Sequence, residues 1–195
     1  MFPWPAFISF ALVTTFTPGA NTILSMRNAA RYGFRRSYLF NLGILTGCAC
    51  VMTLCTVFSA VFFALIPKIQ PVMRVLGAAY ILYLAWHTLF PGRGASDGEK
   101  KGSLYVQGTL LPFINPKYYL YCITAISTYV LPHTSRPLEI AGFALMLLLT
   151  GFFATLCWAF FGSAIQRLMQ NQRTATIINV VMALLLVYCA VSLFL

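Results

Sequence analysis

Long apolar stretches alternate with short polar breaks along this chain of 195 residues. A membrane-spanning helix needs about 20 mostly apolar residues, and six stretches meet that requirement: Pro5–Met26, Tyr38–Ile66, Val72–Phe90, Leu104–Leu131, Leu138–Ile165 and Ile177–Leu195. The segments that connect them are the basic RNAARYGFRR, the turn PKIQP, the polar PGRGASDGEKKG, the turn LPHTSRP and QRLMQNQRT. The pattern therefore predicts six transmembrane helices.

Composition supports this class of protein. The chain is 60% hydrophobic and only 8% charged, whereas about a quarter of the residues in a soluble domain are charged. Three acidic residues are too few for a solvated surface. The basic residues are scattered between the apolar runs and form no cluster, so no nucleic-acid partner is expected. We therefore expect an all-α integral membrane protein surrounded by a lipid bilayer.

Basic residues are distributed unequally between the polar segments that connect the predicted spans. If the first of these connecting segments faces the cytoplasm, the cytoplasmic segments hold nine Lys and Arg residues and the segments on the opposite side hold three. Since basic residues accumulate in cytoplasmic loops, both termini are expected outside, which in a bacterium is the periplasm. No Lys or Arg precedes the first apolar stretch, whereas Arg27 and Arg31 follow it, and this order favours a retained helix over a cleaved signal peptide.

The central polar segment divides the chain into two halves with three predicted helices each. Residues 1–92 form the first repeat, residues 93–103 a cytoplasmic linker, and residues 104–195 the second repeat. Because three is odd, the second half enters the membrane with the opposite orientation. Pro18 and Pro116 lie 98 residues apart, almost half the chain. The sequence thus predicts two inverted three-helix repeats with broken first and fourth helices.

Two short sequences, FTPGANTIL and FINPKYYL, interrupt those two helices with Pro18, Gly19, Asn21, Asn115, Pro116 and Lys117. Proline removes one backbone N–H and clashes with the carbonyl four residues earlier. An unsatisfied backbone group in hydrocarbon costs several kcal/mol, so such a break must face protein or a wet cavity. The asparagines offer donors and acceptors to repair the backbone. Two matching breaks favour a binding site near the membrane midplane over ordinary proline kinks.

Lys117 strengthens the prediction of a site. A charged residue at the centre of a span costs about 2.5–3.5 kcal/mol, and Lys117 lies too near the middle of its stretch to reach an interface easily. No Asp or Glu lies within a predicted span except Glu139 at the edge of the fifth, so a substrate carboxylate is the expected counter-ion. Tyr118 and Tyr121 share a helical face beside it, unlike Tyr119. The lack of acidic residues disfavours a positively charged ligand.

In the second predicted span, Gly43 and Gly47 of GILTG lie four residues apart on one helical face. Small residues at this spacing let a second helix approach closely. We expect a close helix crossing there.

These motifs resemble the LysE/RhtB amino-acid exporter family, which has Pro-Gly-x-Asn in the first of six hydrophobic segments and Asn-Pro-Lys in the fourth. The resemblance covers essentially the whole chain, including GAAYILYLAW in the third segment. It implies a transporter and not an enzyme, with no cofactor or metal, that exports small neutral amino acids across the bacterial inner membrane. Cysteine and O-acetylserine are the expected cargo, and the proton gradient is the expected driving force.

The resemblance places the functional centre at the motif residues Pro18, Gly19, Asn21, Asn115, Pro116 and Lys117, to which the local pattern adds Tyr118. Ala20 departs from the family, because many relatives have proline there. The motifs do not separate cysteine exporters from exporters of homoserine, threonine or leucine, so these cargoes stay open.

A membrane thiol–disulfide conduit is an alternative of another class. It needs a cysteine at each break, but no cysteine adjoins Pro18 or Pro116. The hypothesis therefore depends on Cys122 lying beside a cysteine of the first half. The six cysteines form no metal-binding spacing, and the two histidines lie near span ends without a carboxylate pair, which disfavours an intramembrane enzyme.

Overall fold

The computed structural model describes residues 2–89, 101–166, 168 and 171–194. These residues form helices and no strand: α1 (Trp4–Phe16), α2 (Ala20–Tyr32), α3 (Phe34–Val57), α4 (Ser59–Leu89), α5 (Lys101–Leu110), the 3₁₀ segment η1 (Leu111–Ile114), α6 (Pro116–Thr124), the π-helical segment η2 (Ala125–Val130), α7 (Pro137–Gln166) and α8 (Gln172–Val191). The all-α prediction is confirmed. Most of the predicted linker, residues 93–100, lies outside the described residues.

Four helical segments among the described residues are long and apolar enough to cross a membrane: α3, Lys68–Leu89 of α4, α7 and α8. A fifth span results if α1 and α2, which meet at a bend of 47°, are taken together. The fourth predicted helix is divided among α5, η1, α6 and η2. A multi-pass membrane protein is thus confirmed, whereas the count of six spans stays a prediction.

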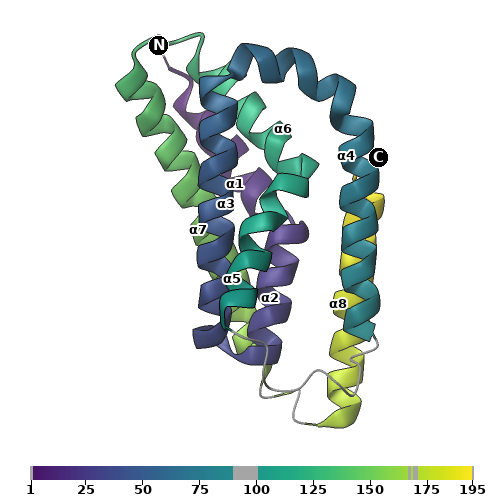
Figure 1. Ribbon diagram of the computed structural model, residues 1–195. Helices are drawn as coiled ribbons and strands as arrows, with labels where there is room; N and C mark the ends of the chain where they lie inside the picture. The colour runs from purple at the N-terminus through teal and green to yellow at the C-terminus, as the bar shows by residue number, and fades with distance from the viewer. Residues whose placement is uncertain (1, 90–100, 167, 169–170, 195) are drawn as a thin grey trace.

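The predicted turn at PKIQP is wrong. The helix α4 continues through residues 67–71, and the chain turns earlier, at Phe58. In Figure 1, the first part of α4 crosses the top of the molecule and the remainder descends beside α8. Proline bends a helix when the lost hydrogen bond and the ring clash are relieved by a kink. A pair of prolines therefore changes the direction of α4 without ending it.

The helices surround the two broken segments. Figure 1 shows α3 and α7 on one side, α4 and α8 on the other, and α1, α2, α5 and α6 between them. The most extensive pairings are α2 with α7, α3 with α5, and α4 with α8. On the outside of α7, Phe153, Phe160 and Phe161 are more than 60% exposed. Large exposed apolar side chains on a long helix are expected where lipid, and not water, surrounds the protein.

Glycines permit the tightest crossings. A Cβ atom added to Gly43 or Gly47 of α3, or to Gly108 of α5, would lie 2.2 Å from a carbonyl oxygen of the other helix. The close crossing predicted from GILTG is therefore confirmed. A similar contact joins α7 to α2, where a Cβ on Gly162 would lie 2.0 Å from the carbonyl oxygen of Met26.

A buried polar cluster holds α2 against α3. Ser25 Oγ donates to Asn41 Oδ1 at 2.7 Å, and Asn41 Nδ2 donates to the carbonyl oxygen of Ser37 at 2.9 Å. All three side chains are fully buried. Because buried polar groups need partners, such a cluster fixes the register of the two helices and thereby the position at which α2 begins.

Candidate functional site

The first break separates α1 from α2 at Thr17, Pro18 and Gly19. The backbone N–H of Gly19 donates to Thr22 Oγ1 at 2.9 Å, which caps the start of α2. Ala20, the departure from the family motif, is the first residue of α2. The first position of a helix accepts proline as well as alanine. The break therefore forms here without a second proline.

The second break is shorter. The segment η1 ends at Ile114, and Pro116 opens α6 at a position where its missing N–H leaves no bond unmade. The backbone N–H of Asn115 donates to the carbonyl oxygen of Pro112 at 3.3 Å. The carbonyl of Pro112, four residues before Pro116, thus has a backbone partner.

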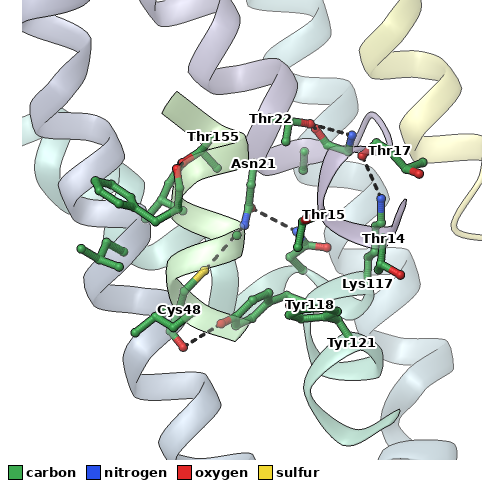
Figure 2. A pocket seen from close by; sticks show the side chains of 18 residues that line it. Thr14, Thr15, Thr17, Asn21, Thr22, Cys48, Lys117, Tyr118, Tyr121 and Thr155 are labelled. Carbon is green, nitrogen blue, oxygen red and sulfur yellow. Dashed lines mark hydrogen bonds between the residues drawn. The ribbon is translucent and has the colours of Figure 1, made fainter. Parts of the chain in front are cut away.

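The two asparagines connect the breaks directly. Asn115 Nδ2 donates to Asn21 Oδ1 at 3.1 Å, and Asn21 Nδ2 in turn approaches Cys48 Sγ at 3.8 Å (Figure 2). We expected these side chains to repair the backbone at the breaks, but they bind each other. Residues 94 positions apart in the chain therefore hold the two halves together at the centre.

A cavity lies where the breaks meet (Figure 2). Its empty volume, which includes space open to solvent, is about 590 Å³. Its lining comprises Thr14, Thr15, Thr17, Gly19, Ala20, Asn21, Thr22, Ile44, Leu45, Cys48, Asn115, Lys117, Tyr118, Tyr121, Leu148, Gly151, Phe152 and Thr155. Of the sequence-predicted residues, Gly19, Asn21, Asn115, Lys117 and Tyr118 line it. Pro18 and Pro116 shape the breaks but are not in the lining.

Lys117 crosses from the second break to the first. Its Nζ donates to the carbonyl oxygen of Thr17 at 3.1 Å, and its side chain is half-buried (Figure 2). The side chain of Lys117 passes over Gly19, where an added Cβ would lie in ordinary contact with Nζ at 3.4 Å. The ammonium therefore rests on a neutral carbonyl and forms no ion pair with a described residue.

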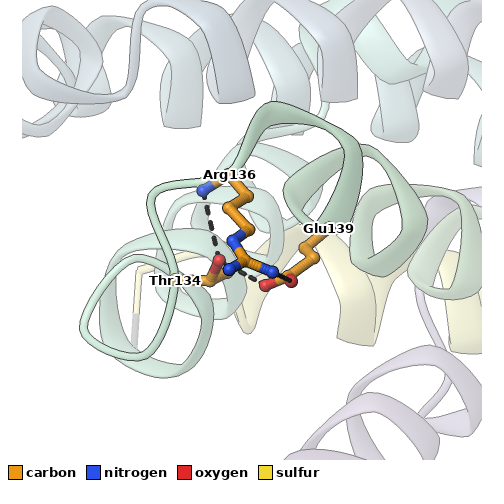
Figure 3. Close-up of polar contacts among 3 residues, drawn as sticks. All are labelled: Thr134, Arg136 and Glu139. Atoms are coloured by element: carbon orange, nitrogen blue, oxygen red, sulfur yellow. Dashed lines mark hydrogen bonds and ion pairs between the residues drawn. The ribbon is translucent and has the colours of Figure 1, made fainter.

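No carboxylate lines the cavity among the described residues. Of the three acidic residues, Asp97 and Glu99 lie outside the part of the chain that the structure describes. Glu139 lies at the start of α7, where it pairs with Arg136 at 3.2 Å and accepts a hydrogen bond from Thr134 (Figure 3). The lining therefore has a positive group and no acidic one.

The tyrosines behave as the helical spacing predicts. Tyr118 and Tyr121 line the cavity, whereas Tyr119 does not. The hydroxyl of Tyr118 donates to the carbonyl oxygen of Cys48 in α3 at 3.0 Å, and that of Tyr121 to the carbonyl oxygen of Leu147 in α7 at 3.2 Å. The two bonds join α6 to both long helices that flank the cavity.

Sequence reasoning missed the threonines. Five line the cavity, at positions 14, 15, 17, 22 and 155. Four of them flank the first break in TTFTPGANT, a polar run within an apolar stretch that could have been noticed. Thr155 carries no such signal, because its contribution depends on the packing of α7 against α2. Cys48 of α3 also forms part of the cavity wall.

Cys122 of α6 does lie beside a cysteine of the first half, because its thiol contacts that of Cys55 in α3. The adjacency required by the thiol–disulfide hypothesis is therefore met. However, both side chains are fully buried and neither adjoins a break. Thiol exchange requires an accessible thiolate, so this pair lacks the access that electron transfer would need.

Comparison with known proteins agrees with the family resemblance of the sequence motifs. The profile of the family described as "LysE type translocator" matches residues 12–195. Proteins named "Cysteine/O-acetylserine efflux protein" are similar to this chain: those of Escherichia coli (strain K12) and Shigella sonnei (strain Ss046) are 36% identical, and that of Salmonella choleraesuis (strain SC-B67) is 37% identical. Each alignment covers 97% of this chain and 96% of the relative. No solved structure matches the chain significantly.

Proposed function

The chain belongs to the LysE type translocator family, and from this premise we propose that it exports small neutral amino acids from the cytoplasm to the periplasm. Cysteine and O-acetylserine are the proposed cargo, because relatives that share 36% of the residues over nearly their full length carry those names. The protein is a transporter and not an enzyme.

The observation that carries the proposal is the charge of the cavity. Lys117 provides one ammonium, and no carboxylate lines the cavity among the described residues. A zwitterionic amino acid brings a carboxylate that Lys117 can pair with. A lysine or arginine substrate would bring a second positive charge with no acidic partner for it, and an unpaired buried charge is costly. Neutral amino acids therefore suit the cavity better than basic ones.

The proposed substrate site consists of Asn21, Asn115, Lys117 and Tyr118 in the lining, with Pro18, Gly19 and Pro116 shaping the breaks. The proposed driving force is the proton gradient. No His, Asp or Glu lines the cavity among the described residues.

The helix pairings support two inverted repeats. If α1 and α2 correspond to α5 and α6, then α3 corresponds to α7 and α4 to α8. The broken helix of each half packs on the second helix of the other half, since α2 contacts α7 and α5 contacts α3. The α4–α6 contact likewise has its counterpart in the α8–α2 contact. Reciprocal pairings of this kind are expected from a two-fold axis in the membrane plane.

The proposed topology places both termini in the periplasm, and reporter fusions test it. We expect fusions after Arg36 and after Lys101 to show cytoplasmic activity, because nine basic residues gather on that side against three on the other. A phosphatase active only in the periplasm and a cytoplasmic fluorescent protein serve as paired reporters. A periplasmic signal at either position would overturn the topology and the inverted repeat.

An efflux assay over a panel of amino acids tests the cargo. Cells that overproduce the protein are expected to release more cysteine and O-acetylserine and to resist toxic analogues of them. Homoserine, threonine, leucine, lysine and arginine complete the panel. Release of only homoserine, threonine or leucine would reassign the cargo within the neutral class. Protection only against lysine or arginine analogues would refute the inference that the cavity, with its positive charge, favours neutral amino acids over basic ones.

The adjacent thiols provide a test against the conduit hypothesis. The double substitution Cys55→Ala with Cys122→Ala is expected to retain export, because neither side chain lines the cavity. The loss of two buried sulfurs should lower stability by about 1–2 kcal/mol, so export is normalised to the amount of folded protein. Loss of export in the double variant at normal folded levels would return the thiol pair to the mechanism.

A further inference from the structure

We propose that the C-terminal end of α1 is the binding site for the α-ammonium group of the substrate, and that the ammonium of Lys117 occupies this site while the cavity is empty. The inference rests on the proposed function, because it takes an amino acid as the cargo. It gives a binding position to the ammonium group of the substrate, whereas Lys117 accounts only for the binding of the substrate carboxylate.

The contact of Lys117 is the first observation. A primary ammonium already lies on the carbonyl oxygen of Thr17, at an N–O distance of 3.1 Å. Its partner is not a carboxylate but the main chain just before Pro18. The same chemical group on a substrate, a primary ammonium, can therefore be bound at this oxygen.

The backbone of α1 explains why a cation is held there. The helix ends at Phe16, and Pro18 has no N–H to donate back to the preceding turn. The last carbonyls of a helix lack helical partners, and its C-terminal end carries roughly half a negative charge. Thr14, Thr15 and Thr17 add hydroxyl oxygens to the same wall of the cavity. This wall offers several neutral acceptors, as an ammonium with three donors requires.

The start of α2, which carries a partial positive charge, lies close to the end of α1. The helix α2 begins at Ala20, only a few residues beyond the end of α1, and its axis is bent by 47° from that of α1. A negative helix end and a positive helix end therefore flank one break. The ammonium and the carboxylate of an α-amino acid are attached to the same carbon atom. One end of the substrate can then bind at Thr17 while the other faces the start of α2.

Binding then exchanges one ammonium for another. The substrate ammonium takes the carbonyl oxygen of Thr17, and Lys117 moves to the substrate carboxylate. Both ammonium groups remain protonated, so the exchange forms and breaks hydrogen bonds only. Each positive group has a partner before and after the exchange, which avoids leaving a buried charge unpaired.

Three related ligands separate this proposal from a purely structural role of Lys117. Cysteine has both charged groups, cysteamine lacks the carboxylate, and 3-mercaptopropionate lacks the ammonium. Their binding to purified protein in detergent is measured by calorimetry with a phosphine reductant present. Wild type is compared with Lys117→Met and with Lys68→Met, a control at an exposed lysine outside the cavity. Size-exclusion chromatography checks that each protein is folded.

The two amines should respond in opposite directions. In Lys117→Met, the affinity for cysteine is expected to fall about tenfold or more, because the carboxylate loses its partner. The affinity for cysteamine is expected to rise severalfold, because no resident ammonium competes for Thr17. Lys68→Met should match wild type with all three ligands. In wild type, 3-mercaptopropionate should bind about tenfold more weakly than cysteine.

Two results would overturn the proposal: a joint fall in the affinities for cysteine and cysteamine in Lys117→Met, or equal binding of 3-mercaptopropionate and cysteine by wild type. The second comparison needs no variant, so it decides the matter even if Lys117→Met fails to fold. If the efflux panel identifies another neutral amino acid as cargo, the same comparison uses its decarboxylated and deaminated analogues. A wrong cargo and a wrong ammonium site are thereby distinguished.

Discussion

Replacing Lys117 by methionine is expected to abolish most export while leaving the amount of folded protein unchanged. Lys117 supplies the ammonium in a cavity that has no acidic residue among those described. Methionine has a similar length and is well tolerated in hydrocarbon, so insertion into the membrane should not suffer. The stability of the empty protein should change little, because the lost hydrogen bond to a carbonyl, worth about 1.5–3 kcal/mol, is offset by removing the cost of desolvating a half-buried ammonium.

The measurement is efflux of the cargo, normalised to the amount of the protein in the membrane. Lys117→Arg is expected to keep part of the export, because it retains the positive charge with a different shape. Lys68→Met, which removes an exposed lysine outside the cavity, is the matched control. Full export by Lys117→Met would show that this lysine does not bind substrate, and the site would then have to lie elsewhere.

Alanine in place of Gly162 should strongly reduce the amount of folded protein. The new Cβ would lie 2.0 Å from the carbonyl oxygen of Met26 and 2.7 Å from its carbonyl carbon. Both atoms belong to the backbone of α2, so no side chain can rotate to relieve the clash. Overpacking of a well-packed contact typically costs about 1–3 kcal/mol, and here the separation of two helices, α2 and α7, must change as well.

Gly142 provides a control on the same helix. An added Cβ there would meet no atom within 4 Å, and alanine favours a helix over glycine by about 1 kcal/mol. Gly142→Ala should therefore melt at the wild-type temperature or slightly above it, whereas Gly162→Ala should melt several degrees lower. Thermal unfolding of the detergent-solubilised proteins measures the difference. Equal melting temperatures for the two variants would show that the α2–α7 contact is looser than described.

Local chemistry explains which features could be predicted from the sequence. The helical class followed from apolar length, the two breaks from proline and asparagine, and a close helix crossing on α3, though not its partner α5, from the spacing of Gly43 and Gly47. Each of these signals lies within a few consecutive residues. The course of α4 could not be predicted in this way, because a proline pair is compatible with either a turn or a bent helix.

The candidate site was predictable only in part for the same reason. Asn21, Asn115 and Lys117 are conspicuous because they are polar within apolar stretches. Their arrangement was not predictable, since the bond between the two asparagines joins residues 94 positions apart. The contribution of α7, through Gly151 and Thr155, depends on how that helix packs against α2. No local pattern in the sequence reports such a contact.

The glycine crossings also affect how easily the helices can pivot. Interlocked side chains resist sliding, because each must leave its groove before the helices can shift. At the crossings of α3 with α5 and of α2 with α7, the contact instead joins a bare glycine to a carbonyl oxygen. Rotation about such a point needs few changes of rotamer, as in the shear motion of packed helices. A pivot at these crossings would move α5 relative to α3 and α2 relative to α7, while the hydroxyls of Tyr118 and Tyr121 hold α6 to α3 and α7.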